Sequence, residues 1–291
     1  MSWVAWKKKF SKTGLLARRD PELLFSIMRS KVQTAFFPAP AGKVTKEIDG
    51  LSMELDLSSG PQTKAMYYDA YEPVTIKVMK KYLKRGDTFI DVGASIGYLS
   101  LVAASLVGKE GQVHSFEPFP RDFARLKEMS ARNSGFRIFA EPYAAGDEAG
   151  EADLDISNLK WVGWNTLVPG FMRKNVLGET CRVKVIRLDD YLMERKDSIG
   201  NIGLIKIDTE GYESKVLKGL EKFFEAHQEK LPPVLCEVTP RVHALLGTSL
   251  SGMADDMKDC GFRAVSLLDE SLEVDLTELD SMTDVLFLPR N

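Results

Sequence analysis

The sequence has few cysteines, and their positions exclude two common uses of this residue. Only Cys181, Cys236 and Cys260 occur among its 291 residues. Their number is odd and none of them has metal-ligand spacing, so we expect neither a disulfide framework nor a zinc site. Free thiols are typical of a reducing compartment, and we therefore expect a cytoplasmic protein.

Long apolar runs are absent as well. No stretch approaches the ~20 consecutive apolar residues that cross a bilayer. The first ten residues, MSWVAWKKKF, also lack the continuous apolar region of a secretory signal. We expect a protein that neither spans a membrane nor is exported. With 44% hydrophobic and 28% charged residues, the composition is that of a globular protein, long enough for one large α/β domain with an extension.

The net charge of −3 is unevenly distributed. Residues 1–43 carry nine Lys/Arg and two acids, a net charge of +7, whereas the rest of the chain has a net charge of −10. This asymmetry favours an anionic surface or partner for the first segment and disfavours a body that wraps nucleic acid.

Within that basic segment, Trp3 and Trp6 precede three lysines. Asp20 is placed to cap a helix that begins at Pro21 and ends before Pro38. Basic residues beside large apolar ones suit a helix at the surface of an anionic membrane. An amphipathic helix packed on the main domain is the alternative, and the sequence leaves both open.

Residues 86–101, GDTFIDVGASIGYLSL, organise the remainder of the chain. Thr88 to Val92 has the length and composition of a buried parallel strand, and a helical apolar pattern begins at Ile96. The loop between them contains Gly93 and Gly97. Gly93 permits a turn that a Cβ would obstruct, and Gly97 permits a close approach of helix and strand. Backbone N–H groups at the helix end would then face a ligand.

Acidic residues beside this loop indicate which ligand it binds. Asp91 stands directly before the glycines, where it would repel a pyrophosphate but attract the sulfonium and ammonium of S-adenosylmethionine. A second strand, Gln112 to Phe116, ends in Glu117, which is placed to accept hydrogen bonds from ribose hydroxyls. The small residues around Ala144 would leave room for a flat adenine ring.

Further strands and helices alternate along the chain. Ile202 to Ile207 predicts a buried strand ending in Asp208, and the next strand ends in Glu237. This order predicts a parallel sheet with right-handed crossovers, whose last two strands form an antiparallel pair. Other predictions are a strand or hairpin arm at 50–57, helices at 72–82, 122–133, 212–220 and 241–260, and strands at 136–139, 182–188, 262–268 and 285–288. Residues 148–181 predict either a lid or binding loop, or an exposed hairpin whose tryptophans pack on the body.

Several ordered motifs of the chain resemble the FkbM family of S-adenosylmethionine-dependent methyltransferases. The resemblance covers roughly residues 50–240. It rests on DVGASIGYLSL, the FEP that contains Glu117, an AAGD turn, LDDY, and IKIDTEGYESKVLKG from Ile205. The family usually has Asn at the position of Ser95, and serine can also donate and accept a hydrogen bond.

The resemblance implies a class I methyltransferase fold, which is Rossmann-like and has a seven-stranded, mostly parallel sheet with one antiparallel strand. It also implies methylation of a hydroxyl on a sugar, polyketide or related small metabolite. We divide the chain into a basic helical extension, 1–49, and a methyltransferase domain, 50–291. The cofactor-binding residues that we expect are Asp91, Gly93, Ser95, Gly97, Glu117 and Ala144.

Three residues are candidates for the base that takes the proton from the acceptor hydroxyl. Asp208 and Glu237 end neighbouring strands at the expected crevice, and His243 follows at the start of a helix. Capping of a helix is the alternative role for Asp208, and a surface position the alternative for His243. Lys206, inside a buried strand, needs a carboxylate partner and predicts a structural ion pair. A Mg²⁺ ion held by Asp208 and Glu237 ranks below direct base catalysis.

Competing function classes lack their own signals. A nicotinamide oxidoreductase would have no acid before the glycine loop, and a nucleic-acid methyltransferase would have a proline-rich turn where this chain has Asp208-Thr209-Glu210-Gly211. A cofactor-binding scaffold or membrane-surface protein that retains the fold is the remaining alternative.

Overall fold

A seven-stranded sheet lies at the centre of the computed structural model, which describes residues 20–36, 39–157, 162–171 and 176–290. In spatial order the strands are β11 (Phe262–Ser266), β12 (Thr283–Pro289), β10 (Val234–Val238), β9 (Ile202–Ile207), β3 (Thr88–Val92), β4 (Gln112–Phe116) and β5 (Arg137–Glu141). Only β12 runs antiparallel to its neighbours. The predicted class I arrangement is confirmed, including the antiparallel final pair.

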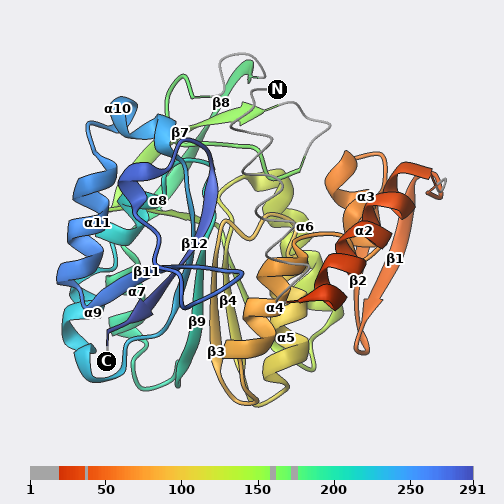
Figure 1. Ribbon diagram of the computed structural model, residues 1–291. Coiled ribbons are helices and arrows are strands. Elements are labelled where there is room, and N and C mark those ends of the chain that lie inside the picture. The colour runs from red at the N-terminus through yellow and green to blue at the C-terminus, as the bar shows by residue number, and fades with distance from the viewer. Residues whose placement is uncertain (1–19, 37–38, 158–161, 172–175, 291) are drawn as a thin grey trace.

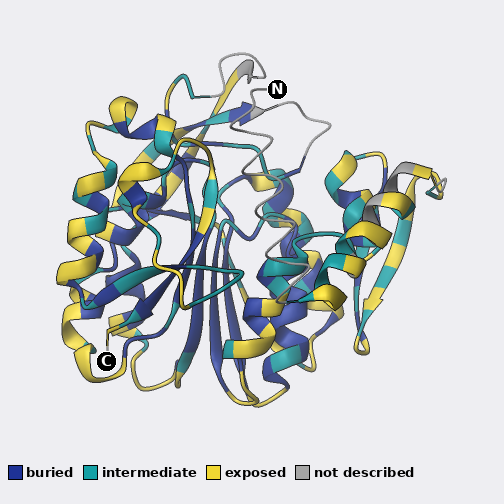
Figure 2. Ribbon diagram, in the orientation of Figure 1, coloured by how far each residue is buried: buried dark blue, intermediate teal, exposed yellow. Residues whose placement is uncertain are grey.

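Helices cover both faces of this sheet (Figure 1). One face carries α4 (Pro73–Tyr82), α5 (Tyr98–Val107) and α6 (Pro120–Arg132), and the other carries α7 (Leu188–Glu194), α8 (Glu213–Lys218), α9 (Glu221–Ala226) and α11 (Leu250–Asp259). Successive residues of a strand point to opposite faces. In β9, Leu204 therefore belongs to one hydrophobic core and Ile205 to the other. Because both faces are covered, nearly every residue of the central strands is buried, as Figure 2 shows.

A hairpin of β1 (Lys43–Ile48) and β2 (Leu51–Asp56) lies beside this body, with α3 (Pro61–Tyr67) after it. Every second residue of β2 is buried, which confirms the predicted hairpin arm. Its partner β1 was not predicted, because KVTKEI has exposed and half-buried positions and no strongly apolar face. The boundary at residue 50 that we assigned to the methyltransferase domain falls in the turn of this hairpin, so β1 lies in the segment that we assigned to the extension.

The stretch that looked least regular in the sequence forms much of a second small sheet. Its strands are β6 (Tyr143–Ala145), β7 (Gly150–Ser157) and β8 (Val176–Ile186), with β8 in the middle. β7 and β8 pair as an antiparallel hairpin. Trp161 lies outside the described residues.

The single helix expected over residues 241–260 is wrong. Three short helices replace it: η2 (Pro240–Val242), α10 (His243–Leu246) and α11. Gly247, with a φ of 65°, ends α10 in the left-handed region. Ser249 then begins α11, because its hydroxyl accepts a hydrogen bond from Gly252 N at 2.9 Å. Two further short helices are η1 (Gln228–Lys230) and η3 (Leu276–Glu278).

The N-terminal extension contains the predicted helix, α2 (Pro21–Phe36). Asp20 caps it, with Oδ1 accepting a hydrogen bond from Leu23 N at 2.9 Å. Trp3 and Trp6 lie outside the described residues. Among the described residues, no helix is long and apolar enough to span a bilayer. The three cysteines have free thiols.

Candidate active site

The glycine loop after β3 is shaped by two close approaches. Gly93 has a φ of 78°, and a Cβ there would lie 1.8 Å from the carbonyl oxygen of Asp208. Gly97 has a φ of 88°, and its Cβ would lie 2.5 Å from Met129 Cε. We expected Gly97 to allow a close approach of its own helix to the strand. The absence of a side chain at Gly97 instead makes room for Met129 of helix α6. Only glycine fits these two positions without displacing neighbours.

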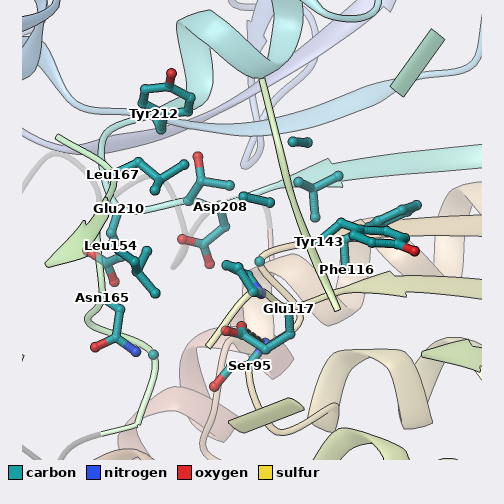
Figure 3. Close-up of a pocket in the computed structure, with 17 residues that line it drawn as sticks. Ser95, Phe116, Glu117, Tyr143, Leu154, Asn165, Leu167, Asp208, Glu210 and Tyr212 are labelled. Carbon is teal, nitrogen blue, oxygen red and sulfur yellow. Dashed lines mark hydrogen bonds between the residues drawn. The ribbon is translucent and has the colours of Figure 1, made fainter. Parts of the chain in front are cut away.

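A cavity opens above this loop, at the carboxyl ends of β3, β4 and β9 (Figure 3). It lies where the strand order reverses at β3 and β9, the usual ligand site of an open α/β sheet. Five predicted site residues line the cavity: Gly93, Ser95, Glu117, Ala144 and Asp208. Four others, Asp91, Gly97, Glu237 and His243, are not part of its wall.

Glu117 connects the glycine loop to helix α6. Its Oε2 accepts a hydrogen bond from Ser95 N at 2.9 Å, and its Oε1 accepts one from Phe119 N at 2.8 Å. Burial, and then the charge of Asp122, raise the pKa of Glu117 to about 8, although the two backbone donors act to lower it. Each oxygen keeps a lone pair for a ligand. Glu117 can therefore hold the loop and bind hydroxyl groups in the cavity.

A buried cation lies directly beneath the cavity. Lys206 Nζ is 3.3 Å from Asp91 Oδ1, 3.3 Å from Asp208 Oδ2 and 3.2 Å from the carbonyl oxygen of Gly93. The sheet register makes Asp91 and Lys206 neighbours on β3 and β9. Burial opposes the charge, but the two carboxylates raise the pKa of Lys206. The predicted structural ion pair of Lys206 is confirmed.

This ion pair changes the interpretation of Asp91. Its side chain is 0% exposed and also accepts a hydrogen bond from Ser100 Oγ at 2.6 Å. Asp91 therefore supports the loop from below and is not positioned to touch a ligand in the cavity. Of the two carboxylates around Lys206, only that of Asp208 reaches the cavity, with 34% of its side chain exposed. One ammonium between two carboxylates leaves net negative charge at this wall.

The other two predicted bases lie farther from the cavity wall. Burial, followed by repulsion from Asp208 and Glu210, raises the pKa of Glu237 far above that of an ordinary carboxyl. His243 is buried, with Nδ1 2.9 Å from Thr248 Oγ1, and burial lowers its pKa. Glu237 is thus favoured in its protonated form, and His243 in its neutral form.

Glu210 also lines the cavity, although no pattern in the sequence predicts it there. Its backbone has a φ of 53°, an uncommon conformation for a residue with a side chain. Glu213 Oε1 accepts hydrogen bonds from Thr209 N and Gly211 N at 3.0 and 2.8 Å, and Thr166 Oγ1 donates to the Glu210 carbonyl at 2.7 Å. Glu213 thus stabilises the turn that precedes helix α8. Glu210 instead lines the cavity, and burial and the charge of Asp208 raise its pKa.

Strand β7 and the segment that follows it supply one wall of the cavity. Leu154, Gly163, Asn165 and Leu167 line it, and Figure 3 shows Leu154, Asn165 and Leu167 on the side opposite Glu117 and Phe116. Backbone hydrogen bonds between Asp155 and Thr166 fold this segment back. The spacing of residues in the sequence did not predict that these residues line the cavity. Their position depends on the pairing of Thr166 with Asp155 of β7, which leaves no periodic pattern in the sequence.

Within the described residues, no group of three His, Cys, Asp or Glu side chains is arranged to hold a metal ion. The buried hydroxyl of Ser95 has no hydrogen-bond partner in that part of the chain. Together with the glycine loop and Glu117, it leaves unused hydrogen-bonding capacity that faces the cavity.

Comparison with known protein families identifies one that covers most of the central sheet. The family model of the methyltransferase FkbM domain matches residues 91–264. The 31-O-demethyl-FK506 methyltransferase FkbM of Streptomyces tacrolimicus is 32% identical over 54% of this chain and 66% of its own length. The hexuronic acid methyltransferase AglP of Haloferax volcanii is 24% identical over 58% of this chain and 65% of its own length. The matches thus cover just under two thirds of each relative.

A solved structure of an FkbM methyltransferase from Methylobacillus flagellatus aligns with 92% of this chain and 60% of its own, at 15% identity and a TM-score of 0.41. The family-model match alone spans more than half of the sequence, from the strand before the glycine loop to the penultimate strand of the sheet. The chain belongs to the FkbM methyltransferase family.

Proposed function

We propose that this protein transfers the methyl group of S-adenosylmethionine to a hydroxyl group of a small metabolite. One observation carries the proposal: the glycine loop, Ser95, Glu117 and Asp208 face a single cavity at the reversal point of the sheet. When bound, the cofactor would supply an electrophilic methyl group on a sulfonium. The free Ser95 hydroxyl and the acidic wall fit a ligand with hydroxyl groups and a positive charge.

The chain offers a different group for each part of that ligand. Glu117 suits the ribose hydroxyls, because its oxygens retain lone pairs beside the loop. Ala144 lies in the wall with Phe116 and Tyr143, a combination of one small and two flat side chains that suits an adenine ring. Asp208 lies between these residues and the segment around Asn165 (Figure 3), so the acceptor is expected at the Asn165 side.

The main contribution of the protein to such a reaction is alignment and exclusion of water, worth up to roughly 7 to 11 kcal/mol. A hydroxyl of high pKa also benefits from a base. Asp208 is our first candidate, because it is the partly exposed carboxylate of the Lys206 ion pair. Glu210 is the second, since it also lines the cavity and its pKa is raised by burial and by the charge of Asp208, which makes the ionised carboxylate a stronger base. A direct role for Glu237 or His243 has less support, because neither lines the cavity.

The acceptor class is inferred from the relatives. One relative is named for methylation of 31-O-demethyl-FK506 and the other for methylation of a hexuronic acid. By analogy we propose a sugar or polyketide hydroxyl for this chain. The free thiols support a cytoplasmic location for the reaction.

Titration calorimetry with S-adenosylmethionine, and separately with NAD, tests the cofactor. We expect binding of the first only, and no heat with S-adenosylmethionine at millimolar concentration would overturn the proposal. Transfer of a labelled methyl group to methyl glucoside, glucuronic acid and a macrolide polyketide then tests the acceptor. Binding without transfer to any hydroxyl compound would favour the scaffold alternative. Loss of transfer on addition of EDTA would support the Mg²⁺ alternative instead of direct base catalysis.

A further inference from the structure

Helix α2 exposes a continuous apolar stripe. Phe25, Met28, Val32 and Phe36 are 69%, 57%, 50% and 80% exposed. Their spacing of three, four and four residues places them on one face, over roughly 16 Å of helix. Nine large hydrophobic residues are exposed in the described part of the chain, and these four are on one helix. The others belong to different elements and loops.

The stripe is not the face by which α2 packs on the protein. Leu23, Leu24 and Ile27 are half-buried, and the helix contacts α3 and α4. An ion pair between Asp20 and Lys77, at 2.6 Å, fixes its first turn to α4. Figure 2 shows exposed residues along its outer side. A helix that is apolar on two opposite faces is usually covered on both, so the stripe calls for a partner outside the described fold.

The charge of the segment selects the kind of partner. Arg29 is exposed and follows Met28 at the border of the stripe. The segment 1–43 as a whole carries its net charge of +7. A second copy of the chain would carry the same positive net charge in this segment, and like charges oppose association. An anionic lipid surface provides both an apolar layer for the stripe and negative headgroups for the basic residues.

We propose that α2 lies in the plane of an anionic membrane surface, with Phe25, Met28, Val32 and Phe36 inserted among the lipids. The inference is independent of the proposed methyl transfer, because no residue of α2 lines the cavity. Figure 1 shows α2 at the outer edge of the molecule, beyond α4 and beside the β1–β2 hairpin. Binding would attach the protein by this edge while the cavity keeps its own walls.

Co-sedimentation of the full chain with phosphatidylcholine vesicles, with and without phosphatidylserine, tests the proposal. Wild type is expected to bind only the vesicles with phosphatidylserine, and salt should weaken binding. The double variant Phe25→Ser/Phe36→Ser should bind at least about tenfold more weakly, because two large side chains no longer enter the lipid. The matched control Leu245→Ser/Leu272→Ser changes side chains that are 52% and 46% exposed elsewhere, and should bind like wild type.

Three results would overturn the proposal. First, wild type could fail to bind the anionic vesicles. Second, the Phe25→Ser/Phe36→Ser variant could bind as tightly as wild type, which would assign the lipid contact to residues other than the stripe. Alternatively, light scattering could show a dimer that the stripe variant abolishes while wild type ignores vesicles, which would assign the stripe to a second copy. Equal melting temperatures and S-adenosylmethionine affinities for all variants would show that the fold is intact.

Discussion

Replacing Glu117 with Gln tests the cofactor site at its most constrained residue. Both carboxylate oxygens accept backbone hydrogen bonds, one from Ser95 N and one from Phe119 N. A glutamine has only one acceptor oxygen, so its amide N–H₂ must face one of these two N–H groups. We expect the glycine loop to lose its anchor and the ribose hydroxyls to lose a charged acceptor.

A hydrogen bond to a charged group contributes about 1.5–3 kcal/mol. Glu117→Gln should therefore weaken cofactor binding roughly 10- to 150-fold, as measured by titration calorimetry. S-adenosylhomocysteine carries the same ribose without the sulfonium, so its affinity should fall by the same factor. Glu141→Gln is the matched control, because Glu141 also ends a strand but accepts from Tyr191 Oη and is not part of the cavity wall.

The pH dependence of binding provides a second measurement. The folded protein holds the pKa of Glu117 at about 8, above the usual carboxyl value. A ribose that donates to Glu117 favours the ionised form, so wild-type affinity for S-adenosylhomocysteine should rise with pH up to about 8 and then level off, by at most about tenfold per pH unit.

The Glu117→Gln variant should lack this rise of affinity with pH.

The free energy of unfolding of the wild-type protein should change with pH in the opposite direction to the affinity. The folded state retains a proton that the unfolded carboxyl releases near its ordinary pKa, so the contribution of Glu117 to stability declines from about pH 4.5 to about pH 8. Unchanged affinity in Glu117→Gln, or the same pH profile in both proteins, would refute this account of the site.

Three other substitutions test the remaining parts of the site. Asp208→Asn should lower methyl transfer by roughly 10²- to 10⁴-fold if Asp208 is the base, and should weaken binding of S-adenosylmethionine more than of S-adenosylhomocysteine; near-normal transfer would leave Glu210 as the base. Lys206→Met leaves the buried carboxylate of Asp91 without its cation and should destabilise the fold by about 3–5 kcal/mol in denaturant unfolding. Lys222→Met, at a side chain 62% exposed, should have little effect, and equal stability of the two variants would contradict the ion-pair assignment. Gly93→Ala places a Cβ against the Asp208 carbonyl and should abolish cofactor binding in calorimetry, while Gly150→Ala, which has no neighbouring atom within 4 Å, should bind normally; binding by both would show that the close approach is not required.

The central sheet could be predicted because its strands are buried on both faces. Residues 88–92, 112–116 and 202–207 are strands with the predicted bounds. Nearly every residue of these three strands is buried, and the β-branched, leucine and aromatic residues that they contain suit strands covered on both faces. By contrast, β1 is polar, and it is a strand because β2 pairs with it. Pairing of this kind depends on tertiary structure and leaves little pattern in the sequence.

The candidate site likewise contains residues that the sequence predicts and residues whose positions depend on tertiary structure. Glu117 and Asp208 follow predicted strands, so their positions at the cavity followed from the rule that parallel strands end at one edge. Glu210 lines the cavity only because its backbone adopts a positive φ, held by Glu213 on one side and Thr166 on the other. The position of Thr166 depends in turn on a segment that folds back from a distant part of the sequence.

The hairpin of β7 and β8 also has a consequence for protein engineering. It leaves the domain after β6 and returns through β8, and the register places Ala145 beside Ile186 and Gly150 beside Val185. Its entry and exit points are therefore adjacent. A replacement hairpin with the same end-to-end distance could be inserted there without lengthening any other connection. The glycine loop and Glu117 lie outside the exchanged segment, whereas Asn165, on the proposed acceptor side, lies inside it. Such chimeras would therefore change the acceptor side of the cavity and leave the proposed cofactor-binding residues unchanged.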